Sequence, residues 1–175
     1  GEARLAGVWH AAGVLSDGLL PKQNAQKLSF VYGPKTHGAT WLLGASSGAA
    51  LQACVLFSSV AALLGGSGQG NYSAANTCLD ALSESCRAHG CRSVSVQWGA
   101  WAEIGMAARG AASQRMAAME AASGFERIGL AQGLGALAVA VQSTSPAALG
   151  VIPVRWGRLL GDGAVPAFLT EVAPH

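Results

Sequence analysis

Short apolar segments alternate with longer amphipathic segments along this chain, and this alternation predicts an α/β fold. Apolar runs bounded by Gly, Ser or Pro are typical of buried parallel strands. The predicted strands cover residues 5–10, 53–58, 92–97 and 149–156. The predicted helices run from about Asn24 past Pro34 towards Leu43, from Tyr72 to about His89, and from Leu130 to Gln142. Strands separated by helices form a parallel sheet, because crossover connections are right-handed.

Three other segments are distinguished by their amino-acid composition. Residues 65–70 form a Gly-rich loop between the second strand and the next helix. Residues 103–125 are rich in Ala, Met and Ser, which predicts a helical flap with an adaptable apolar face that can close over a substrate. A plain surface helix is the alternative. The tail from Gly157 contains several Gly and Pro residues and resembles the start of a linker.

Composition excludes some classes of protein. The chain has 175 residues, 51% hydrophobic and only 11% charged, against a typical charged share of about 25%. No charged residue occurs between Lys35 and Asp80. Every apolar stretch is nevertheless interrupted before the roughly 20 residues that a spanning helix needs, so we expect no membrane segment. The formal charge of +2 is small and scattered, so we expect no nucleic-acid partner either.

The cysteines do not form a metal-binding or disulfide pattern. Their spacing shows neither paired CxxC motifs nor histidines at zinc spacing. We interpret them as structural or incidental thiols in a reducing, cytoplasmic compartment. The four are Cys54, Cys78, Cys86 and Cys91.

A hydroxyl residue thirteen positions before a tyrosine carries the main chemical signal. Ser59 follows the second predicted strand and Tyr72 opens the next helix, so both side chains can hydrogen-bond one carbonyl oxygen. Tyr72 can then donate a proton to that oxygen while a hydride arrives from a nicotinamide. Taken singly, such a tyrosine is usually a packing residue and a Ser-Ser pair a common turn, so the hypothesis depends on the combination.

The residues around Ser59 and Tyr72 indicate which family of enzymes the chain resembles. They read LFSSVAA from Leu56, GQGNYSAAN from Gly68 and LDAL from Leu79. This segment resembles the active site of short-chain dehydrogenase/reductases and, more narrowly, the ketoreductase domain of modular polyketide synthases and related type I fatty acid synthases. The resemblance implies an α/β fold with a Rossmann-like doubly wound parallel sheet, of which this chain is the C-terminal, catalytic portion.

The resemblance also implies a catalytic tetrad. Most of the superfamily carries a lysine four residues after the tyrosine, where this chain has Asn76. Ketoreductases of polyketide synthases have Asn there and a lysine upstream, matched by Lys35 in the segment YGPKTHGA. A phenol is a poor participant at neutral pH unless a cation favours its ionised form. Lys35 would supply that charge and bond the nicotinamide ribose, and Asn76 would orient Lys35. The implied catalytic residues are Lys35, Ser59, Tyr72 and Asn76.

The same resemblance implies NADPH as the cofactor. Residues 11–13 match the turn beneath the cofactor's adenosine half, and Gly99 matches a turn near the nicotinamide carboxamide. His10 is expected to pack near the cofactor cleft, and neither His10 nor His37 matches a catalytic position. The implied cofactor-binding residues are Ala11, Ala12, Gly13, Lys35, Tyr72 and Gly99.

One expected feature of a dinucleotide-binding fold is missing from the sequence. Such a fold needs a first strand and a GxGxxG turn that holds the pyrophosphate at a helix N-terminus. The loop at residues 65–70 lacks that spacing. We therefore expect residues 1–160 to be the catalytic half of a ketoreductase domain and residues 161–175 to start a linker, towards an acyl carrier domain. The expected partners are an acyl carrier protein bearing a phosphopantetheine-bound β-ketoacyl chain, the upstream half and neighbouring synthase domains.

Stereochemistry follows from two further motifs of the family. An LDD motif before the lysine accompanies B-type reduction, which gives a D-configured 3-hydroxyl, and a Trp eight residues before the Tyr accompanies the A-type. Here the first motif reads Leu15-Ser16-Asp17 and position 64 is Leu, so the pattern favours the B-type. Asp17 taken alone could also be an ordinary loop carboxylate. The candidate substrate-side residues are Asp17 and, in the expected flap, Met106.

The leading hypothesis is an NADPH-dependent β-ketoacyl reductase acting on a carrier-bound chain. One alternative is a non-catalytic, reductase-like structural domain of a synthase, but such domains usually lack the Ser/Tyr pair. Another is a stand-alone dehydrogenase or a sugar-nucleotide epimerase, which the Asn76/Lys35 exchange argues against.

Overall fold

The computed structural model describes residues 4–102, 123–161 and 163–173. The chain forms two compact units. The first comprises Gly1–Trp98 and Leu134–Val151, and the second comprises Gly99–Gly133 and Ile152–His175. Every described residue expected to be catalytic lies in the first unit.

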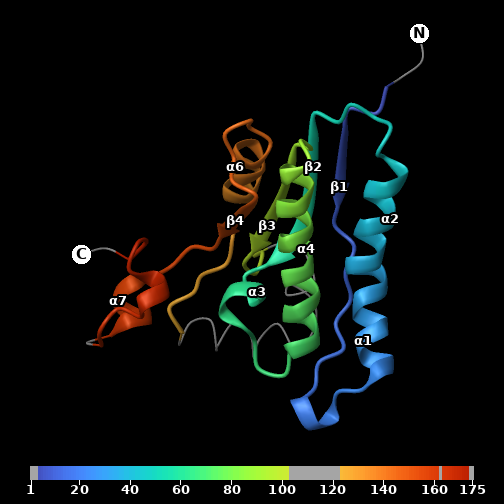
Figure 1. The fold of residues 1–175 in the computed structure, drawn as a ribbon. Coiled ribbons are helices and arrows are strands. Elements are labelled where there is room, and N and C mark those ends of the chain that lie inside the picture. Colours follow the sequence, from blue (N-terminus) through green and yellow to red (C-terminus); the bar gives the residue numbers. More distant parts are fainter. Residues whose placement is uncertain (1–3, 103–122, 162, 174–175) are drawn as a thin grey trace. The chain divides into compact units, whose positions relative to one another are not determined.

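The first unit is built on a parallel sheet of four strands (Figure 1). The strands are β1 (Gly7–His10), β2 (Ala53–Ser59), β3 (Ser93–Trp98) and β4 (Ala148–Val151). Their order in the sheet is β1-β2-β3-β4, and each neighbouring pair is parallel. The α/β architecture predicted from the hydrophobic pattern is therefore confirmed.

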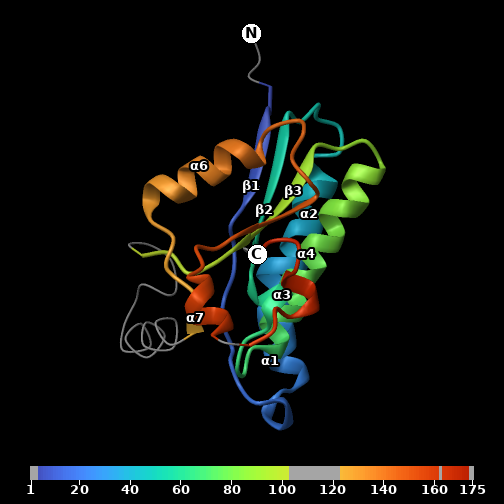
Figure 2. The ribbon, with the colours of Figure 1, turned by 90° about the vertical axis from the view of Figure 1, so that its left-hand side faces the viewer.

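Helices cover both faces of this sheet (Figure 2). One face carries α1 (Ala25–Tyr32), α2 (Gly38–Ala45) and α4 (Gly70–Ala88), and the other carries α6 (Leu130–Ala140), of which residues 134–140 belong to the first unit. Between α4, α2 and the sheet lies an apolar cluster. Its fully buried members are Ala39, Cys54, Leu56 and Leu79.

The predicted helix after Asn24 is continuous but irregular. Asn24 is its N-cap and accepts a hydrogen bond from the Lys27 amide, which satisfies a free amide of the first turn. The helix then passes through a π-helical turn, Gly33–His37, before α2 begins at Gly38. Pro34 stands near the start of this turn. Helical structure past Pro34 was predicted, but the wider turn was not.

Two boundaries differ from the prediction. The last strand ends at Val151 rather than continuing to residue 156. Pro153 explains this end, because proline has no amide hydrogen to donate to a strand ladder. The segment after Ser59 contains a short helix, α3 (Ala61–Leu64), which was not predicted and which precedes the expected Gly-rich loop.

The second unit contains short elements. A helix, α7 (Trp156–Leu160), precedes the expected linker, and a 3-10 turn, Ala167–Leu169, forms within it. Most of the expected flap, residues 103–122, lies outside the described residues. No helix in the described part of the chain is long and apolar enough to cross a membrane.

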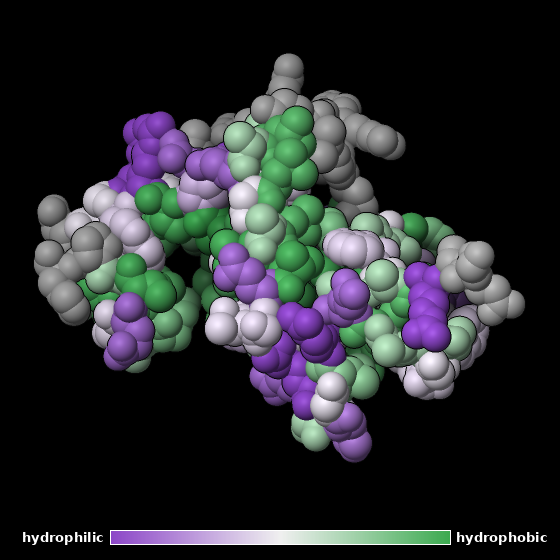
Figure 3. All heavy atoms as spheres, turned by 90° about the horizontal axis from the view of Figure 1, so that it is seen from above, coloured by the Kyte–Doolittle hydropathy of each residue, from purple (hydrophilic) through white to green (hydrophobic). Residues whose placement is uncertain are grey.

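Large apolar side chains are exposed on the first unit. Seen along the strands from their amino ends, apolar atoms (green) lie at the surface beside polar ones (Figure 3). Trp9 belongs to the edge strand β1 and is 53% exposed. An edge strand with an exposed aromatic side chain is typical of a surface that another segment covers.

Candidate active site

The four residues of the implied tetrad converge beside the carboxyl end of β2. Ser59 is the last residue of β2, and Lys35 lies in the π-helical turn. Tyr72 and Asn76 lie one turn apart on α4. Ligands bind in open parallel sheets outside the carboxyl ends of the strands, so this is the expected edge for a site.

Lys35 is buried deeply for a lysine, with 3% of its surface exposed. Its Nζ donates a hydrogen bond of 2.9 Å to the Phe57 carbonyl on β2. The same Nζ lies 5.3 Å from the centre of the Tyr72 ring, a distance at which a cation is attracted to the ring face. The ammonium therefore faces the tyrosine, as the tetrad requires.

Burial changes the acidity of this lysine. It lowers the pKa of Lys35 from 10.5 to about 8, and the negative charge of Asp80 opposes that change. Desolvation disfavours the charged form of an amine, whereas a nearby carboxylate favours it. The Lys35 ammonium can thus lose its proton at a pH only slightly above neutral.

Tyr72 is also buried, with 9% of its surface exposed. Burial raises the pKa of its phenol, and interactions with the Asn76 and Ser59 side chains act in the opposite direction. The carboxylate of Asp17 adds a smaller increase to the pKa of the same phenol. A phenol that keeps its proton at neutral pH is suited to act as a proton donor.

Asn76 has an unused acceptor at the centre of the site. The residue is fully buried, and its Nδ2 donates to the Tyr72 carbonyl at 2.8 Å. Its Oδ1 has no hydrogen-bond partner among the described residues. Because an unsatisfied buried acceptor is unfavourable, this oxygen is suited to receive a donor from a ligand, a water or Lys35.

The expected cofactor-binding residues lie in both units. Residues 11–13 follow the carboxyl end of β1, with Ala11 and Ala12 exposed. A Cβ built on Gly13 would lie 3.4 Å from Cε of Lys35, so residues 11–13 lie directly beside this lysine. The exposed backbone there and the unpaired Oδ1 of Asn76 are compatible with a nicotinamide cofactor at this end of the sheet. Gly99 directly follows β3 but belongs to the second unit.

Of the two substrate-side candidates, only Asp17 lies among the described residues. Its Oδ2 accepts a hydrogen bond of 3.3 Å from Gln69, and the amide of Gly18 donates to the Gly68 carbonyl at 2.8 Å. The loop that carries Asp17 therefore lies beside the start of α4, close to Tyr72. Met106 lies outside the described residues.

Two contacts around Lys35 were not anticipated from the sequence. Asp80 interacts electrostatically with Lys35, and its oxygens accept from Ser95 at 2.6 Å and from Gln97 at 2.8 Å. His10 bonds the backbone of Lys35. The sequence could have pointed to Asp80, because Tyr72, Asn76 and Asp80 are spaced four residues apart and therefore lie on one face of a helix.

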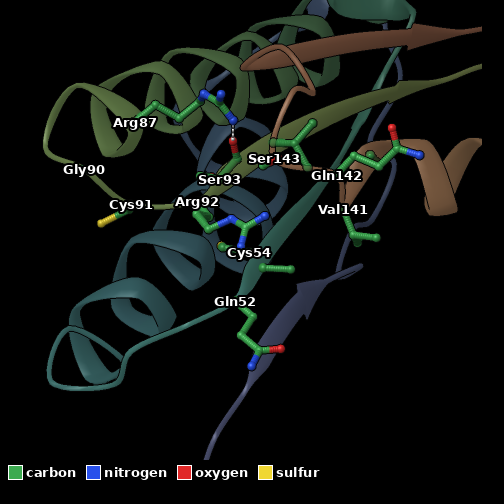
Figure 4. A pocket seen from close by; sticks show the side chains of 13 residues that line it. Gln52, Cys54, Arg87, Gly90, Cys91, Arg92, Ser93, Val141, Gln142 and Ser143 are labelled. Carbon is green, nitrogen blue, oxygen red and sulfur yellow. Dashed lines mark hydrogen bonds between the residues drawn. The ribbon is translucent and has the colours of Figure 1, made fainter.

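A cavity of about 130 Å³ lies at the opposite end of the sheet (Figure 4). Its lining includes Gln52, Arg87 and Arg92, near the amino ends of β2 and β3. The Arg87 guanidinium donates to the Ser93 carbonyl at 3.1 Å. This cavity is therefore remote from the tetrad and does not belong to the candidate active site.

The four cysteines differ in burial, from the buried Cys54 to the exposed Cys91. All four are free, with Cys54 buried in β2 and Cys78 half-buried on α4. In the described part of the chain, no three His, Cys, Asp or Glu side chains are grouped to hold a metal ion.

Comparisons with known proteins agree with this fold. The model of the KR domain family matches residues 1–103. The chain is 37% identical to polyketide synthase GfsA of Streptomyces halstedii, over 97% of this chain and 2% of that protein. It also resembles the solved structure of A-type ketoreductases from a modular polyketide synthase, with a TM-score of 0.81 and 32% identity over 98% of this chain and 34% of that chain.

A solved structure of lower sequence identity shares the fold of this chain. A short-chain dehydrogenase from Streptomyces avermitilis has a TM-score of 0.63 and 19% identity, over 85% of this chain and 60% of that chain. The expected fold class, a Rossmann-like sheet of the short-chain dehydrogenase/reductase type, is thus confirmed. The chain spans about a third of the ketoreductase structure and a far smaller share of the synthase.

We expect the contribution of Lys35 to the stability of the folded protein to increase with pH above about 8. Between about 8 and 10.5 the unfolded chain holds a proton on this lysine that the folded state does not. Lys35 should therefore add roughly 3 kcal/mol to the free energy of unfolding across this window. The raised pKa values of Tyr72, Cys54 and Cys86 act in the opposite direction, so the measure is the difference in the free energy of unfolding between the unsubstituted protein and Lys35→Met. Urea unfolding as a function of pH should show this difference grow by that amount.

The matched control is Lys22→Met, because Lys22 is exposed. This variant should keep the pH dependence of the unsubstituted protein. Identical pH profiles for Lys35→Met and the unsubstituted protein would contradict the buried ammonium.

Proposed function

The chain belongs to the KR domain family, the ketoreductases of modular polyketide synthases, and from this membership we propose that it carries the catalytic residues for NADPH-dependent reduction of a β-ketoacyl thioester. The product is the β-hydroxyacyl thioester. The observation that carries the proposal is the approach of the Lys35 ammonium to the buried ring of Tyr72, at 5.3 Å, beside the carboxyl end of β2.

Each residue of the tetrad has a distinct task in this proposal. Tyr72 donates its phenolic proton to the ketone oxygen, and Ser59 donates a hydrogen bond to the same oxygen and holds it in place. Lys35 stabilises the negative charge that forms on the phenol after the proton has left. Asn76 offers its free Oδ1 to the Lys35 ammonium or to a water between them.

A bound nicotinamide cofactor supplies the hydride that adds to the ketone carbon. The residues proposed to hold its nicotinamide half are Lys35, Tyr72 and Gly99, and those beneath its adenosine half are Ala11, Ala12 and Gly13. The choice of NADPH comes from the family resemblance. The pyrophosphate would be held by a Gly-rich turn in an upstream half-domain, since residues 65–70 lack the required spacing.

The substrate is proposed to arrive on an acyl carrier protein. Residues 1–160 would form the catalytic half of the domain, and residues 161–175 would lead towards the carrier domain. Neighbouring synthase domains are the other expected partners, in line with the multidomain polyketide synthases that this chain resembles. A purely structural, reductase-like domain would not need a buried Lys/Tyr pair, which favours the enzyme.

The stereochemical proposal is B-type reduction. Asp17 retains the second acid of the LDD motif, and its loop is hydrogen-bonded to residues at the start of α4. The overall fold cannot decide the type, because an A-type ketoreductase shares it. The proposal therefore depends on Asp17 and on the absence of a Trp at position 64.

In the complete domain, Tyr72→Phe should remove the proton donor and keep the ring that packs against Lys35. Turnover should fall by at least about 100-fold, while cofactor affinity should change little. Steady-state reduction of a β-ketoacyl thioester and fluorescence titration with NADPH measure the two effects. Near-normal turnover would remove Tyr72 from its proposed role, and Tyr32→Phe serves as the control because it makes the same change on a neighbouring helix.

The 175-residue chain by itself should not bind NADPH tightly and should reduce no ketone. The proposed pyrophosphate-binding turn lies elsewhere, and the edge strand β1 exposes Trp9, so the chain should also tend to aggregate. Isothermal titration calorimetry with NADPH tests the first point. Micromolar binding would mean that the proposed domain boundary is wrong.

The complete domain should form the D-configured 3-hydroxyacyl product. Asp17→Ala should increase the share of the opposite enantiomer, because the loop beside α4 then loses the carboxylate that bonds Gln69. Chiral chromatography of the released product gives the ratio, and Glu84→Ala, at an exposed position of α4, is the control. A predominantly L-configured product would overturn the B-type proposal.

A further inference from the structure

We propose that His10 is a positioning residue, which holds the backbone of Lys35 in the π-helical turn and thereby fixes the place of the Lys35 ammonium. The inference rests on the proposed function, because the group that is positioned is its catalytic lysine. His10 itself does not touch the reacting atoms in this proposal. It acts through Lys35.

The key contact joins two elements that are far apart in the sequence. Nε2 of His10, at the carboxyl end of β1, lies 2.9 Å from the carbonyl oxygen of Lys35. Since a carbonyl oxygen only accepts, this ring nitrogen must carry a proton and donate. His10 is 7% and Lys35 is 3% exposed, so water has little access to replace the bond.

The backbone around Lys35 explains why it needs such support. Lys35 lies within the π-helical turn Gly33–His37, and single π turns in α-helices interrupt the regular hydrogen-bond ladder and often occur at functional sites. The amide of Gly38 is directed at both the Lys35 and the Gly33 carbonyls. The imidazole of His10 adds a donor from β1 to this Lys35 carbonyl, which stabilises the turn.

The packing of this contact leaves little freedom for the ring. A Cβ built on Gly38 would lie 3.3 Å from Cε1 of His10, so the helix backbone approaches the imidazole closely. His10 pairs with Leu56 in the parallel register of β1 and β2. The next residue, Phe57, accepts the hydrogen bond from the Lys35 ammonium.

Lys35 is therefore held at two points by neighbouring strands. His10 of β1 fixes its main chain, and the Phe57 carbonyl of β2 fixes its ammonium at 2.9 Å. Together the two contacts determine where the charge lies relative to the Tyr72 ring, 5.3 Å away. Displacing a catalytic group by about 1 Å can lower the rate about 100-fold, so loss of the His10 bond should affect turnover.

The experiment compares three variants of the complete ketoreductase domain that contains this chain. His10→Phe keeps a ring of similar size but has no donor, and His10→Gln has a side-chain N–H that can reach the same carbonyl. The control variant, His37→Phe, also replaces histidine by phenylalanine, but at an exposed position of the π-helical turn that carries Lys35. We expect kcat to fall roughly 10- to 100-fold in His10→Phe, with KM for the thioester unchanged, and to recover in His10→Gln. His37→Phe should behave like the unsubstituted domain.

A double-mutant cycle with Lys35→Ala identifies the route of the effect. If His10 acts through Lys35, His10→Phe should cause little further loss in a domain that already carries Lys35→Ala. Equal additional losses in both backgrounds would overturn the inference. So would equal kcat values for folded His10→Phe and the unsubstituted domain.

The two proposals can fail separately. Full activity of Lys35→Ala would overturn the proposed function, whereas a large loss in Lys35→Ala beside a fully active His10→Phe would overturn only the role of His10. Thermal unfolding of each variant shows whether it folds, and His10→Leu replaces His10→Phe if the latter does not. If neither donor-free variant folds while His10→Gln does, the bond serves the fold and the positioning role is wrong.

Discussion

Burial of one ammonium ion is the constraint on which the arrangement of the first unit depends. Lys35 is 3% exposed, and a buried charge is tolerated only where hydrogen bonds and opposite charge compensate for lost water. The Phe57 carbonyl supplies the hydrogen bond and Asp80 supplies the charge. These contacts bring the π-helical turn, β2 and α4 together at one end of the sheet, where Tyr72 also lies.

The helix α4 carries three side chains of the candidate site at regular spacing. Tyr72, Asn76 and Asp80 occupy successive turns of one face, since residues four apart lie above one another on a helix. Asp80 is held on β3 by Ser95 and Gln97, which fixes the rotation and height of the helix against the sheet. The position of the Tyr72 phenol is therefore set by polar contacts two turns away as well as by its own packing.

The parallel sheet explains why residues so distant in sequence can share a site. In a parallel sheet all strands end at the same edge, so the residues after β1 and at the end of β2 are neighbours. Among the strands that the structure describes, the edge strand β1 has only β2 beside it, and Trp9 remains exposed. Since the chain spans about a third of the ketoreductase structure it resembles, an upstream half-domain that completes this edge is part of the proposed function.

The sequence by itself determined the α/β class and the four strands, because hydrophobic periodicity is a local property of the chain. The candidate tetrad was implied by the resemblance of its motifs to those of ketoreductases. The prediction extended the last strand to residue 156, although Pro153 argued for an earlier end. The π-helical turn around Lys35 was not predicted. The sequence also did not assign the bond from His10 to Lys35 or the charge of Asp80 beside that lysine. Both contacts join elements through the sheet, and only the tertiary structure decides which side chains meet when β1, β2 and α4 pack together.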